Sequence, residues 1–135
     1  MNNTIKTESF ASPPPPAFAA WIGMDWGDKE HATCLFAPTE SQLQREKFKH
    51  SPESLHGWLK GLGKRFAGKT VALALEANRG PLLHVFAAYP WLEVYPVNPV
   101  TSARFRKAFT PSGAKDDQPD ADLLLEILRC HTSKL

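Results

Sequence analysis

The stretch that decides the fold is TVALALE, residues 70–76, an apolar run that ends in a glutamate. The run from 71 to 75 has no polar face, which is typical of a strand covered by other elements on both sides. Such strands occur in sheets with parallel neighbours and helical crossovers, so we expect an α/β fold. Glu76 then ends a buried strand, where a carboxylate costs free energy unless it is paired or binds a cation.

Upstream of this strand the sequence predicts three strands and a helix. The strands are expected at WIGMDWG (21–27), HATCLFA (31–37) and the more polar QLQREKFKH (42–50). Their short connections favour an antiparallel meander. Residues 51–53, Ser-Pro-Glu, form a helix start, because Ser caps the first turn and Pro fits at its beginning. Apolar residues then follow at helical spacing: Leu55, Trp58, Leu59 and Leu62.

Downstream, helices and one further strand are expected. GPLLHVFAAY (80–89) predicts a helix, and LEVYPVN (92–98) predicts a strand at a sheet edge, since Pro96 has no N–H to donate. PVTSARFRKAF (99–109) predicts a basic helix, and a last helix is expected from about 117 to 130. The order is βββαβαβ followed by two helices. It resembles the ribonuclease H-like (RuvC-like) fold, a mixed five-stranded sheet with helices on both faces.

Length and composition fit one domain, which we expect at residues 20–135. Residues 1–19, with four consecutive prolines at 13–16, predict a disordered, proline-rich tail. The formal net charge of +2 neither requires nor excludes nucleic acid. The two cysteines form no metal-binding pair and no signal peptide is visible, so we expect a cytoplasmic location. No apolar run approaches the roughly 20 residues of a membrane span.

Acidic residues occur where a fold of this kind can bring them together. Asp25 lies in an otherwise apolar strand and Glu76 ends another, while Asp117 and Asp120 are three residues apart before an apolar helix. Carboxylates that share a site repel one another unless a cation lies between them. Hard oxygen ligands select Mg²⁺ or Mn²⁺, and two such ions can clamp a phosphodiester between the attacking and leaving oxygens.

The aspartates also have a purely structural explanation. Acidic side chains stabilise helix N-termini, and an Asp cap contributes about 1 kcal/mol. The stretch DDQPDAD, residues 116–122, does not decide between a cap and a cation site by itself. Caps do not explain Asp25 or Glu76, which lie within or directly after apolar strands.

Four blocks of the sequence resemble the N-terminal RuvC-like domain of the DEDD transposases, insertion-sequence recombinases related to the Piv-type DNA invertases. The blocks are IGMDWGDKEH, ALEANRG, VNPVTSARFRKAF and SGAKDDQPDADLL. The family pattern Lys-x-Asp-x-x-Asp-Ala falls on Lys115, Asp117, Asp120 and Ala121. The family more often has a small hydroxyl residue where Asp116 stands, and Asp117 is kept because of its spacing from Asp120.

This resemblance implies a metal-dependent DNA transposase or recombinase domain. Asp25, Glu76, Asp117 and Asp120 are then the catalytic residues and the ligands of Mg²⁺ or Mn²⁺. The implied partners are DNA and a structured guide (bridge) RNA, with homo-oligomerisation at full length and no membrane. Family members carry a further C-terminal domain with a nucleophilic serine, so the resemblance also implies a truncated copy whose own activity is open.

Basic residues near the expected acidic site are candidates for nucleic-acid contacts: Arg104, Arg106, Lys107 and Lys115. Two other functions remain open at this point. DWGDKE resembles the first phosphate loop of the actin-like and sugar-kinase-like ATPases, although Asp28 would repel phosphate. A non-catalytic nucleic-acid-binding remnant would keep the basic residues without using the acids.

Overall fold

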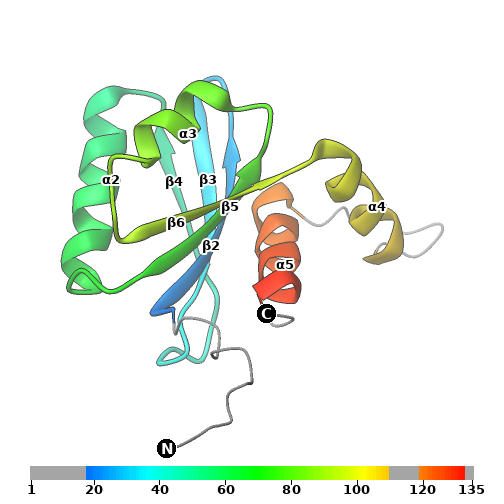
Figure 1. Ribbon diagram of the computed structural model, residues 1–135, viewed down its shortest axis with the longest axis horizontal. Coiled ribbons are helices and arrows are strands. Elements are labelled where there is room, and N and C mark those ends of the chain that lie inside the picture. The colour runs from blue at the N-terminus through cyan, green and yellow to red at the C-terminus, as the bar shows by residue number, and fades with distance from the viewer. Residues whose placement is uncertain (1–17, 110–118, 133–135) are drawn as a thin grey trace, which may run out of the picture.

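A computed structural model describes residues 18–109 and 119–132 as an α/β sandwich (Figure 1). The strands and helices are, in chain order, β2 (Ala20–Trp26), β3 (Glu30–Phe36), β4 (Gln44–Lys49), α2 (Pro52–Arg65), β5 (Val71–Glu76), α3 (Gly80–Phe86), β6 (Leu92–Val97), α4 (Pro99–Phe109) and α5 (Asp120–Thr132).

The sheet has the order β4-β3-β2-β5-β6. The first three strands pair antiparallel, and β5 pairs parallel with β2 and β6. This confirms the expected mixed five-stranded sheet, and the architecture is ribonuclease H-like. β2 is central with β5 beside it, and β6 lies at an edge, as Pro96 predicted. The carboxyl ends of β2 and β5 therefore lie side by side.

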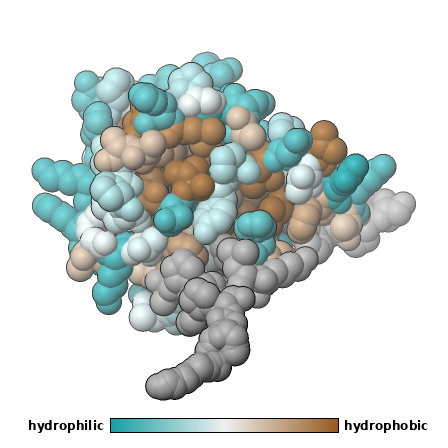
Figure 2. All heavy atoms as spheres, in the orientation of Figure 1, coloured by the Kyte–Doolittle hydropathy of each residue, from teal (hydrophilic) through white to brown (hydrophobic). Residues whose placement is uncertain are grey.

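Helices cover both faces of the sheet (Figure 1). On one face α2 and α3 pack over the larger side chains of β5, from Val71, Leu73 and Leu75. On the other face α5 packs over the alternate positions of β5, Ala72 and Ala74. The run 71–75 is buried on both sides because each face has its own helical layer. In Figure 2, apolar residues reach the surface over α3 and the edge strand β6.

The α5 face of the sheet is built from small residues, which lets the helix approach closely. A Cβ on Gly23 would overlap the carbonyl oxygen of Ala121 and the backbone nitrogen of Leu125. Ala72 and Ala74 of β5 and Cys34 of β3 lie under the same helix. Glycine at 23 is therefore required by the packing, and it sets the height of α5 above the sheet.

Two expected boundaries are wrong. Phe18, which we placed in the tail, is 6% exposed and packs with Trp21, while Ala19 donates a backbone hydrogen bond to Thr70. The last helix begins at Asp120 and not near residue 117, because Pro119 disfavours helical backbone before it. None of the described helices has the length and apolar composition needed to cross a membrane.

Candidate active site

Three of the four predicted catalytic acids line one cavity of about 240 Å³. Asp25 lies near the end of β2, two residues after Gly23 and so on the α5 face of the sheet. Glu76 ends β5, two residues after Ala74, on the same face. Asp120 begins α5, beside the Ala121 that packs on Gly23. The parallel strands and the close helix bring the three acids to one cavity.

The Asp25 carboxyl is in an unfavourable environment for its charge. Burial raises its pKa above the ordinary value, and the negative charges of Asp120 and Glu76 raise it further. The guanidiniums of Arg79 and Arg106 act in the opposite direction and lower it. The charges of both other acids therefore act on Asp25, and they raise its pKa more than the two arginines lower it.

Glu76 accepts a hydrogen bond from a serine hydroxyl of α4, which also lines the cavity. The Ser102 Oγ lies 3.1 Å from Glu76 Oε2 and 3.0 Å from the carbonyl oxygen of Pro99, one helical turn earlier in α4. Ser102 is 8% exposed. A serine hydroxyl has one proton, so donation to Glu76 fixes that carboxylate at the expense of the bond within the helix.

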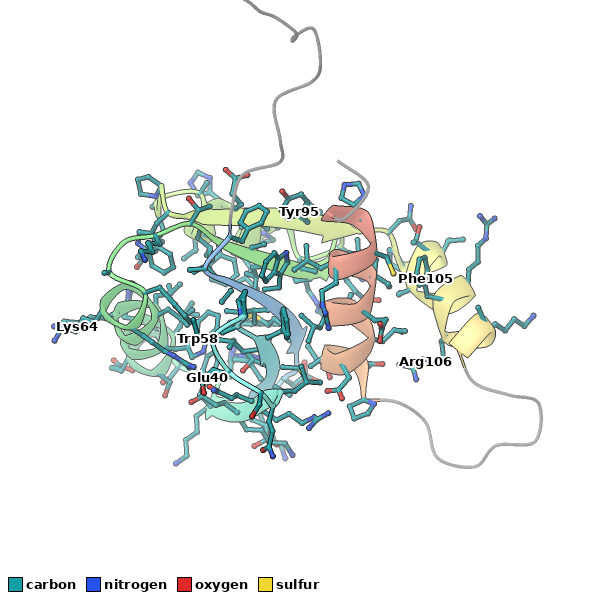
Figure 3. All side chains as sticks on the ribbon, turned by 90° about the horizontal axis from the view of Figure 1, so that it is seen from below. Glu40, Trp58, Lys64, Tyr95, Phe105 and Arg106 are labelled. Carbon is teal, nitrogen blue, oxygen red and sulfur yellow. The ribbon has the colours of Figure 1, made fainter. Side chains whose placement is uncertain are left out.

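Asp120 forms an ion pair with Arg106 of α4. Figure 3 shows Arg106 between α4 and α5, on the side where the two helices meet. The Arg106 side chain is 29% exposed and that of Asp120 is 60% exposed, so the pair lies at the rim of the cavity. Arg106 also lines the cavity itself. A residue expected to bind nucleic acid thus neutralises one of the expected metal ligands.

Arg79 is the second arginine of the cavity, and its contact is different. Its Nη2 donates to the carbonyl oxygen of Trp26, 3.1 Å away. This bond joins the loop after β5, three residues beyond Glu76, to the end of β2, next to Asp25. The acceptor is neutral, so Arg79 keeps its positive charge uncompensated by this contact.

A buried histidine, His31, packs against Trp26 and supports the end of β2. The rings of Trp26 and His31 stack with centroids 3.3 Å apart, and His31 is fully buried. The His31 Nδ1 accepts from the backbone N–H of Gly27 at 3.1 Å, and its Nε2 lies 3.1 Å from Nδ1 of His50. Burial, together with the charges of His50 and Arg79, lowers the pKa of His31 to about 4.

The donor chemistry of the cavity fits a hard divalent cation, since three carboxylates line it and repel one another. In the described part of the chain, no three His, Cys, Asp or Glu side chains are arranged closely enough to share a metal ion. The fourth expected ligand, Asp117, lies outside the described residues.

The remaining predicted contacts to nucleic acid are distributed along α4. Arg104 and Lys107 line a shallow hollow with Val100, which is 57% exposed. This hollow is next to the acidic cavity, because Arg106 lines both. Lys115 lies outside the described residues.

Two charged or hydroxyl-bearing residues of the cavity, Arg79 and Ser102, were not predicted. Arg79 follows Glu76 by three residues in a loop, where no periodicity reveals the direction of a side chain. Ser102 is an ordinary helical serine in sequence, one turn after the Pro99 that starts α4. A search for polar residues three positions after Glu76 and three positions after the Pro99 that starts α4 would have selected both.

Comparisons with known proteins identify a family. Residues 22–135 match the family described as the IS110-type DEDD transposases. The chain is also similar to a Sinorhizobium fredii protein named "Putative transposase y4uE", with 30% identity over 112 residues. That alignment covers 81% of this chain and 31% of the relative, so the chain spans about a third of the relative's length.

Proposed function

This chain belongs to the IS110-type DEDD transposase family, and from that premise we propose that it is a metal-dependent DNA-processing domain of an insertion-sequence transposase. The proposed reaction is phosphodiester cleavage and strand transfer with Mg²⁺ or Mn²⁺. Family membership favours this function over an actin-like or sugar-kinase-like ATPase.

One observation carries the proposal: Asp25, Glu76 and Asp120 come from three separate elements and line the same cavity. A capping role explains only Asp120, at the start of α5. It does not explain why Asp25 has a raised pKa from burial and from the other two acids. The pKa of Asp25 stays raised although Arg106 pairs with Asp120, which is the arrangement expected of a site that takes up a cation.

The proposed ligands are Asp25, Glu76 and Asp120, with Asp117 as the fourth. A bound divalent ion would activate an attacking oxygen or stabilise a leaving oxygen at phosphorus. Ser102 holds the Glu76 carboxylate through its hydrogen bond, so that the acid is oriented before the ion arrives. Arg79 is the cavity's candidate for contacting a phosphate oxygen, because its hydrogen bond goes to the neutral carbonyl of Trp26.

The proposed partners are DNA and a structured guide RNA. Arg104 and Lys107, on the exposed side of α4 beside the cavity, are suited to backbone phosphates, and Lys115 is retained as a proposed contact. Oligomerisation and a distal nucleophilic serine, which the family resemblance implies for the full-length protein, stay proposals.

Binding of a DNA duplex and a single strand by this chain, measured with Mn²⁺ and with chelator, tests the function. We expect Mn²⁺-dependent binding that is lost in Asp25→Asn and in Glu76→Gln. Binding that is indifferent to Mn²⁺ and to both substitutions would instead support the non-catalytic nucleic-acid-binding domain.

A further inference from the structure

The two cationic side chains of the cavity have different partners. Arg79 donates to a backbone carbonyl, while Arg106 forms its ion pair with Asp120, one of the proposed metal ligands. A carboxylate engaged by a guanidinium has fewer oxygen lone pairs for a metal ion. The Arg106 guanidinium also carries a positive charge beside the proposed cation site, so it repels an incoming cation.

From this arrangement we infer that Arg106 is an internal counter-ion that competes with the divalent cation for Asp120. Before the ion binds, Arg106 neutralises Asp120 and limits the repulsion among the three acids. When the ion binds, Asp120 exchanges the guanidinium for the metal, and Arg106 is turned out of the ion pair. This inference rests on the proposed metal site, and it adds a residue that controls the affinity of that site.

The placement of Arg106 makes the exchange feasible. Arg106 lines both the acidic cavity and the neighbouring hollow that contains Arg104 and Lys107. A side chain that leaves Asp120 thus joins two other cations on the face proposed for nucleic acid. Because the pair is at the rim, with Asp120 60% exposed, its loss does not leave a buried charge unpaired.

The test measures the affinity for Mn²⁺ alone by calorimetry at pH 8, where carboxyl protonation does not interfere. Arg106→Gln is expected to bind Mn²⁺ about tenfold more tightly than the unchanged protein. That is the size expected for removing one positive charge roughly 6 Å from a divalent ion in water-like surroundings. Arg106→Lys keeps the charge and should stay within about threefold of the unchanged protein.

Arg104→Gln is the matched control, because it removes the same charge from the same helix but does not line the acidic cavity. A second control places Arg106→Gln in an Asp120→Asn background, where the gain should disappear because the contested ligand is gone. Thermal unfolding in chelator establishes that each variant is folded.

The outcomes separate this inference from the function on which it rests. If the unchanged protein binds Mn²⁺ and Arg106→Gln binds no more tightly than Arg104→Gln, competition is excluded while the metal site stands. Weaker binding by Arg106→Gln would make Arg106 a residue that positions Asp120, which also overturns the inference. If neither protein binds Mn²⁺, both the inference and the metal site fail. Binding by Arg106→Gln alone would support strong competition.

If Arg106→Gln does not fold, a structure of the unchanged protein with Mn²⁺ decides. Asp120 on the ion and away from Arg106 supports competition, and an intact ion pair beside a bound ion contradicts it.

Discussion

The absent side chain of Gly23 leaves the space that the carbonyl oxygen of Ala121 occupies. This contact between the central strand and α5 fixes where Asp120, the residue before Ala121, meets Asp25, two residues after Gly23. We expect Gly23→Ala to lower the free energy of unfolding by about 1–3 kcal/mol, because backbone atoms of α5 must move. Denaturant unfolding measures the loss.

Gly61→Ala is the matched control for Gly23→Ala. Gly61 lies in α2, and a Cβ there meets nothing within 4 Å. The alanine should stabilise the helix by about 0.5–1 kcal/mol. Equal effects of the two substitutions would show that α5 does not lie on Gly23.

Asp25→Asn should stabilise the metal-free protein. The folded-state pKa of Asp25 is raised, so ionising this carboxyl above its ordinary pKa of 3.8 costs stability, and the cost persists at neutral pH. Asparagine removes the charge and should raise the Tm in chelator by roughly 2–5 °C. A drop in Tm would mean that Asp25 has a structural partner and is not held ready for a cation.

Ser102→Ala should weaken metal binding by freeing the Glu76 carboxylate. Loss of the 3.1 Å hydrogen bond is expected to lower stability by about 1 kcal/mol and Mn²⁺ affinity by about three- to tenfold. Ser102→Thr retains the hydroxyl and should restore most of the affinity. Thr101→Ala, one residue away and outside the acidic cavity, should leave Mn²⁺ affinity unchanged.

His31 predicts a dependence of stability on pH. Its pKa is lowered to about 4 in the folded protein, against 6.5 ordinarily. Between these values the unfolded chain binds a proton that the folded protein does not, so stability falls as the pH is lowered from about 6.5 to 4. The slope from this residue approaches about 1.4 kcal/mol per pH unit. His31→Phe should reduce the slope by that amount, and an unchanged slope would assign it to other groups.

Sequence predicted the topology because the decisive signals are local. The unbroken apolar run at 71–75 requires two helical layers, and Pro96 marks the edge strand without reference to any other element. Only part of the cavity was predicted. Asp25 and Glu76 could be predicted because they lie at strand ends. The pairing of Arg106 with Asp120 depends on how α4 packs against α5, and the periodicity of a sequence does not reveal such packing. The expected start of the last helix, near 117, is wrong because Pro119 disfavours helical backbone at the residue before it.

The central claim is that the acids form a cation site. Thermal unfolding with and without Mn²⁺, on the unchanged chain and on the Asp117→Asn/Asp120→Asn double variant, tests it most directly. We predict that Mn²⁺ raises the Tm of the unchanged chain and leaves that of the double variant unaltered. If Mn²⁺ changes neither Tm and the double variant is less stable under both conditions, the aspartates serve only the stability of the helix start and of the ion pair with Arg106, and the claim is wrong.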